Sequence, residues 1–210
     1  MSRVFSGATF FNGDISKWEV SRATDMSRMF QGVEAFNGDI SKWDVSSVTN
    51  MSGVFSGYTQ FNQPIGDWNV SSVVALDDAF QGAQEFNQDI DTWNIAAVTT
   101  LESTFEDATS FDQDIDTWDV QAVTTLASTF KGATAFDQPL DSWITSSVSD
   151  LTSTFEGASS FVQDIDGWDT AQVTDLDGVF DGVSSSFDRR SIDYRLIFDR
   201  SSSDDRPMFA

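Results

Sequence analysis

The feature that most constrains this 210-residue chain is a repeat of 25 residues that runs through residues 1–175 without insertion or deletion. Large apolar side chains recur at that spacing. The two clearest columns are Phe5, Phe30, Phe55, Phe80, Phe105, Phe130, Phe155 and Phe180, and Trp18, Trp43, Trp68, Trp93, Trp118, Trp143 and Trp168. One repeat alone cannot bury such residues, so successive repeats must stack with like side chains over like. We therefore expect these columns to form the core, over seven full repeats and a partial eighth that ends near Phe187.

Residues 46–70 illustrate the local structure expected in one repeat. The β-branched, alternating residues 46–51 predict a short strand. Ser52 is a candidate helix cap, and residues 53–56 predict one or two helical turns that end at Gly57, where a positive φ is expected. The predicted fold is an α/β solenoid of leucine-rich-repeat type, with a parallel strand ladder and short helical turns.

The sequence of one unit also resembles a known family. Residues 29–55, MFQGVEAFNGDISKWDVSSVTNMSGVF, are similar to the BspA-like bacterial surface-protein repeat, also called the DUF285 repeat. The resemblance extends over residues 1–187, although Ile144, Thr145 and Thr170 depart from the repeat pattern. It implies a leucine-rich-repeat-like solenoid, an extracellular or cell-surface location and an adhesive role, and it implies no enzymatic activity.

Composition excludes several functional classes. The chain has 34 acidic and 11 basic residues, a net charge of −23, which disfavours nucleic acid and anionic membranes as partners. No apolar run is long enough to span a bilayer. Because the chain has no His and no Cys, it cannot form a Ser-His-Asp triad, a Cys nucleophile or a His/Cys zinc site. Repeated carboxylates offer equal environments, whereas acid–base catalysis needs two that differ. We expect no enzyme.

Two columns of aspartates are the candidate metal site. They form Asp-x-Asp pairs in three repeats: Asp89 and Asp91, Asp114 and Asp116, Asp164 and Asp166. Ca²⁺ prefers several carboxylate oxygens, which stacked repeats could supply. The alternative is that each Asp accepts hydrogen bonds from backbone N–H groups of a solvated turn.

Three further features are candidate surface sites. An exposed Trp column would stack on sugars, whereas a buried one is core. Two short Thr columns, Thr99-Thr100 over Thr124-Thr125 and Thr104 over Thr129 and Thr154, would suit ice binding. Asn69 and Asn50 each begin an N-glycosylation sequon, and Asn69 is the better candidate because Met51 is expected to face inward.

The repeat region, 1–187, is followed by a different segment, 188–210. Residues 1–187 hold 29 acidic and 6 basic residues and hence all 23 net negative charges. The last 23 residues hold five Asp and five Arg. Residues 188–198 are expected to cap the final repeat, ahead of a flexible end, or to form an arm whose Arg189, Arg190 and Arg195 bind an acidic partner.

The sequence thus predicts a non-catalytic scaffold for surface adhesion or for assembly into a larger complex or filament, with protein partners or copies of itself. The alternatives are a carbohydrate- or calcium-binding module and, more remotely, ice binding. No other cofactor is expected. An extracellular or cell-surface location is expected, with the targeting segment outside the given sequence.

Overall fold

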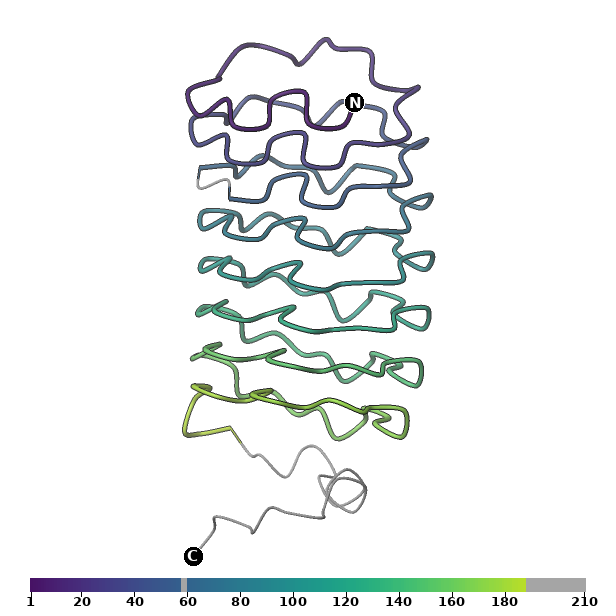
Figure 1. Cartoon of the computed structure of the whole chain (residues 1–210), viewed down its shortest axis with the longest axis vertical. Coiled ribbons are helices and arrows are strands. Elements are labelled where there is room, and N and C mark those ends of the chain that lie inside the picture. The colour runs from purple at the N-terminus through teal and green to yellow at the C-terminus, as the bar shows by residue number, and fades with distance from the viewer. Residues whose placement is uncertain (58–59, 188–210) are drawn as a thin grey trace, which may run out of the picture.

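The computed structural model describes residues 1–57 and 60–187, which form a stack of irregular coils (Figure 1). Each coil is one repeat, and equivalent side chains of successive repeats lie over one another. The rings of Phe80 and Phe105 are parallel with centroids 5.5 Å apart, and those of Trp68 and Trp93 are 6.5 Å apart. The stacking that the 25-residue period required is therefore present.

The predicted α/β solenoid with a strand ladder and helical turns is wrong. The described residues contain no helix and no strand. Within the predicted strand 46–51, Asn50 makes isolated parallel bridges to its equivalents Asp25 and Ala75. The chain turns at residues 46–47 before this bridge and again directly after it, so the pairing never extends into a strand.

The segment 51–57, which we call the zigzag segment together with its equivalents at 25-residue spacing, replaces the predicted helical turn. Alternate N–H groups point to the next repeat: Met51 donates to Ala75 O (3.0 Å), Gly53 to Asp77 O (2.8 Å) and Phe55 to Ala79 O (2.9 Å). The intervening Val54 and Ser56 N–H groups instead donate to the carbonyls three residues earlier and close four-residue β-turns. An α-helix needs consecutive N–H groups aligned along one axis, and this alternation rules it out.

Positive φ angles make this zigzag possible. Gly57 has φ of 64°, and its glycine equivalents in other repeats have φ of 68–75°, as the sequence predicted. Asp107 is the non-glycine at this position and adopts 56°. A second left-handed position, which the sequence did not reveal, falls at Gly53 and is mostly filled by other residues: Arg3, Arg28, Asp78, Ser103, Ser128 and Ser153.

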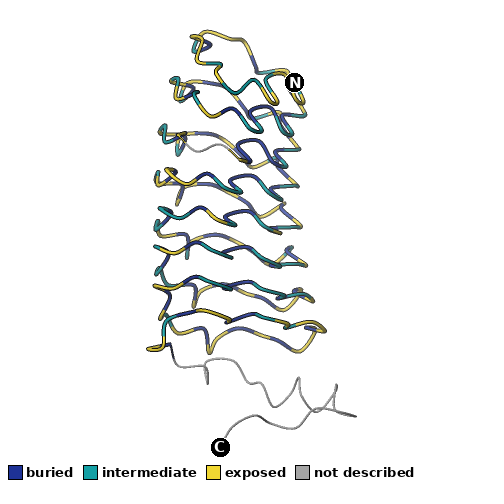
Figure 2. Cartoon of the chain, turned by 60° about the vertical axis from the view of Figure 1, so that its left-hand side comes forward, coloured by how far each residue is buried: buried dark blue, intermediate teal, exposed yellow. Residues whose placement is uncertain are grey.

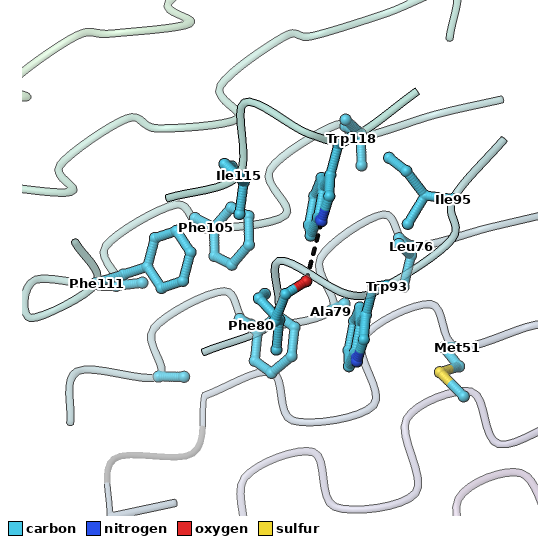
Figure 3. Packing of buried hydrophobic residues seen from close by; sticks show 14 of the residues in the cluster. Met51, Leu76, Ala79, Phe80, Trp93, Ile95, Phe105, Phe111, Ile115 and Trp118 are labelled. Carbon is cyan, nitrogen blue, oxygen red and sulfur yellow. Dashed lines mark hydrogen bonds between the residues drawn. The ribbon is translucent and has the colours of Figure 1, made fainter. Parts of the chain in front are cut away.

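The core lies inside the coil (Figure 2), and it consists of the predicted columns. The Phe residues from Phe30 to Phe155 are fully buried, and Trp43 to Trp168 are 2–6% exposed. Each of these indoles donates its Nε1–H to a carbonyl of the preceding repeat. Trp118 donates to Ile90 O at 3.1 Å, the bond drawn in Figure 3. The Trp column is therefore core, as expected, and apart from the first residue, Trp18, at 40% exposed, its rings cannot stack on sugars.

Candidate functional site

The predicted Asp-x-Asp pairs lie on one edge of the stack, where the chain turns between Ile90 and Trp93 and at equivalent positions. The first Asp of each pair uses Oδ1 to accept the backbone N–H of the second. The distances are 3.0 Å for Asp89–Asp91, 3.0 Å for Asp114–Asp116 and 2.9 Å for Asp164–Asp166. These are Asx turns, the alternative to metal binding that the sequence left open.

Hydrogen bonds and charges at this turn shift the pKa values of some of its Asp side chains. Where Ser follows at the second position, its hydroxyl also donates to the Asp, and this bond lowers the pKa of Asp14 (Ser16 Oγ to Oδ1, 2.7 Å). In the Asp89–Asp91 pair, desolvation and then the charge of Asp89 raise the pKa of Asp91. Over residues 1–57 and 60–187, no group of three or more acidic side chains could hold a metal ion. Calcium stays a prediction, and an equal melting temperature in EDTA and in excess Ca²⁺ would contradict it.

A column of Asn and Asp side chains links each repeat to the next, and the sequence did not predict its role. Oδ1 of Asn62 accepts the backbone N–H of Asn87 at 3.0 Å and Nε2 of Gln88 at 2.8 Å. Asp112 accepts the same pair of bonds from Asp137 and Gln138, at 3.0 and 2.8 Å. The signal was visible as Asn or Asp at one repeat position and Gln at the next. The column comprises Asn12, Asn37, Asn62, Asn87, Asp112 and Asp137.

The two Thr columns have different environments. Thr104, Thr129 and Thr154 are fully buried, and the Thr129 hydroxyl approaches the carbonyls of Leu101 and Leu126 at 2.9 and 2.7 Å. The expectation that this column could face ice is wrong, because its hydroxyls satisfy core carbonyls. Thr99 and Thr124 are exposed, and Thr124 Oγ1 donates to Thr99 O at 3.2 Å.

The two sequons differ in accessibility. Asn69 is exposed, and its Oδ1 accepts Ser71 Oγ at 2.8 Å. Asn50 is half-buried at the parallel bridge, and the following Met51 is fully buried, as expected. Asn69 is the sequon asparagine at the surface, and its glycosylation stays a prediction.

Acidic side chains also gather on the outer side of the zigzag segments. Desolvation and the neighbouring Asp77 carboxylate raise the pKa of Asp78, and desolvation followed by the charge of Asp78 raises the pKa of Glu102. Two ion pairs are found in the described ranges: Lys42–Asp67 at 3.6 Å and Lys131–Glu156 at 2.9 Å. Most carboxylates on this stack thus face solvent without a cation.

The predicted partner-binding residues Arg189, Arg190 and Arg195 and the proposed cap or arm, 188–210, lie outside the described residues. None of the described segments forms a helix long and apolar enough to cross a membrane.

The sequence of the repeats matches a known protein family. A family model described as "Mycoplasma protein of unknown function, DUF285" matches residues 1–91 and 74–194. The chain belongs to the DUF285 family. The two matches together take in every repeat, so the family resemblance seen in the sequence is confirmed. No curated protein and no solved structure matches the chain.

Proposed function

We propose that this DUF285 protein is a non-catalytic scaffold that binds protein partners or further copies of itself through the polar side chains repeated along its outside. The observation that supports this most directly is that the repeats bury most of their aromatic rings and expose mainly polar side chains. From the second repeat to the seventh, the Trp rings and almost all Phe rings lie in the core. Polar and acidic side chains that recur in register lie outside, together with a few aliphatic ones such as Ile144, so weak contacts with a partner can add up along the stack.

Catalysis fits this arrangement poorly. The sequence has no His and no Cys. The exposed Asp side chains of different repeats hold one kind of bond to one kind of turn, for example Asp89 and Asp114. An enzyme needs groups whose environments push their pKa values apart around a substrate.

We place the protein outside the cell or at the cell surface, because the repeat resembles those of bacterial surface proteins. Labelling intact cells of the source organism with an antibody to the repeats tests this location. A signal that needs prior permeabilisation of the cells contradicts it.

The scaffold role is tested by removing surface charge without disturbing the turns. In the triple variant Asp39→Asn, Asp89→Asn, Asp114→Asn, each amide oxygen can still accept the turn N–H, as Asn69 and Asn94 do at another turn. We expect an unchanged melting temperature and a reduced yield of the partners that are cross-linked to the protein in its native source. Equal recovery of the same partners, or recovery of the wild-type chain only as a monomer without cross-links, would overturn the proposal.

A further inference from the structure

The sixth repeat, residues 126–150, is the one complete repeat in which both surface turns lose their Asp or Asn. Pro139 stands where Asp114 and Asp164 cap a turn in the neighbouring repeats, and Ile144 stands where Asp119 and Asp169 do. Ile144 offers no acceptor to the N–H of Ser146, whereas Asp119 accepts the equivalent N–H of Gln121 at 3.1 Å. The need for a turn cap, which accounts for Asp or Asn at this position in other repeats, therefore does not account for Ile144.

The order of polar and apolar side chains is also reversed at this point. Ile144 is 52% exposed, and the next residue, Thr145, is 2% exposed in a position that Val120 fills in the preceding repeat. The Thr145 hydroxyl is satisfied by Asp169 O at 3.1 Å. The core thus contains the polar side chain of Thr145, while the large aliphatic side chain of Ile144 lies in solvent. The exposure of Ile144 contributes nothing to the stability of the fold.

Two shallow depressions flank this segment. One, about 320 Å³, lies between the fifth and sixth repeats and is lined by Ile144, Ser142, Asp116 and Asp119 among others. The other, about 440 Å³, lies between the sixth and seventh repeats and is lined by residues that include Pro139, Asp141, Asp164 and Asp166. Carboxylates therefore line both depressions, and the exposed Ile144 lines the first of them.

These carboxylates have no cation of their own within the described ranges. The two ion pairs, Lys42–Asp67 and Lys131–Glu156, do not involve them. Lys131 is the only basic residue between Asp44 and Phe187. Asp116 Oδ1 accepts the N–H of Ser142 in the next repeat at 2.9 Å, and Asp119 Oδ1 accepts the N–H of Gln121 in its own turn, so each carboxylate is held through one oxygen.

We infer that this surface of repeats five to seven, centred on Ile144, is a docking site for an extended basic segment of a partner protein in which Arg or Lys alternates with aliphatic residues. An aliphatic side chain of the segment packs on Ile144, and the flanking cations reach the carboxylates of the two depressions. Arg suits this site because its stem can cover apolar surface while its fork binds a carboxylate. The inference rests on the proposed scaffold function and names one kind of partner for it.

The test uses the full-length chain and three labelled peptides, whose alternating sequences are Arg-Leu-Arg-Leu-Arg, Arg-Ser-Arg-Ser-Arg and Glu-Leu-Glu-Leu-Glu. Binding is followed by fluorescence anisotropy. We expect saturable binding of the Arg-Leu peptide, weaker binding of the Arg-Ser peptide and none of the Glu-Leu peptide. No saturable binding of the Arg-Leu peptide, or equal affinity for the Arg-Ser peptide, would overturn the inference.

The variant Ile144→Asp separates aliphatic docking from simple charge attraction. It restores the turn cap of the other repeats, so the fold is retained, and it adds a negative charge. Charge attraction alone would make the Arg-Leu peptide bind more tightly, whereas loss of the aliphatic contact weakens it, by at least about tenfold.

Matched variants complete the test. Asp119→Asn keeps the turn acceptor but removes a carboxylate, and it should weaken binding several-fold. Asn94→Asp adds a charge at the equivalent position of the fourth repeat and should leave binding unchanged. Unchanged or tighter binding by Ile144→Asp overturns the docking site but leaves the scaffold function standing, because that function is tested at Asp39, Asp89 and Asp114.

Discussion

The two sides of each repeat are joined to the next repeat by different groups. On the zigzag side, the bonds run from backbone to backbone, as from Phe55 N to Ala79 O. On the opposite side, side chains make the links: Asn62 accepts two bonds from the following repeat, and Trp68 Nε1 donates to Ile40 O of the preceding one at 3.1 Å. On the zigzag side, backbone groups, which every residue has, hold the repeats in register. On the opposite side, the register depends on particular side chains, those of Asn or Asp and of Trp.

This difference explains which positions vary. The left-handed position of the zigzag segment is filled by Arg28, Gly53, Asp78 or Ser103 in successive repeats, since its backbone bonds do not depend on the side chain. The Trp position never varies in seven repeats. Substitutions should therefore be costly at the Trp and Asn positions and mild at the left-handed position of the zigzag segment.

The largest effect is expected from Trp93→Ala. The ring lies between Trp68 and Trp118, with centroids 6.5 and 6.4 Å away, and its loss also leaves Ile65 O without its indole donor. We expect a loss of roughly 3–5 kcal/mol in the free energy of urea unfolding. Trp93→Phe, which keeps an aromatic ring, should lose less. If Trp93→Ala kept full stability and instead lost sugar binding, the column would be a ligand site.

Asn62→Ala should have the next largest effect. It removes the acceptor of the Asn87 N–H and of the Gln88 amide, at a cost of about 1–3 kcal/mol. Asn62→Asp is the matched control and should be nearly neutral in the same unfolding experiment, because Asp112 and Asp137 accept equivalent bonds. Equal stability of the Ala and Asp variants would show that this column does not help to hold the repeats together.

On the zigzag side, Ser128→Gly should stabilise the protein. Ser128 has φ of 56°, and Gly53 and Gly178 occupy the same position in other repeats. Relief of the left-handed strain outweighs the added freedom of the unfolded chain, for a net gain of about 0.5–1 kcal/mol. The neighbouring Ala127→Gly gains no such relief and should destabilise by a similar amount in the unfolding titration. A loss at both positions would mean that side chains matter on this side too.

The smallest effect concerns the acidic side chains on the outer side of the zigzag segments, such as Asp78. Because the pKa of Asp78 is raised in the folded protein, its charged form destabilises the fold above that pKa, and the penalty disappears as the pH falls through it. Asp78→Asn should therefore raise the melting temperature slightly at neutral pH and leave it unchanged well below pH 3.8, the ordinary value. A gain that persists in acid would point to the backbone rather than to charge.

Much of this architecture could be predicted from the sequence. The fixed 25-residue period required stacking in register, and the Phe and Trp columns identified the core. The glycines at Gly57 and its equivalents marked one left-handed position. The Asp-x-Asp pairs indicated a turn, although composition alone could not distinguish a turn cap from a metal ligand, because both need a carboxylate oxygen directed at a positive partner.

Only the tertiary structure decided how the backbone closes each coil. Residues 46–57 have local preferences for a strand and a helical turn, but bonds to the next repeat compete for alternate N–H groups and leave neither element. The same contacts place Thr129 in the core and Ile144 in solvent. The sequence determined by itself that the repeats stack, because periodicity is a property of the chain. Which groups join them depends on atoms 24 or more residues apart, and no local preference encodes those.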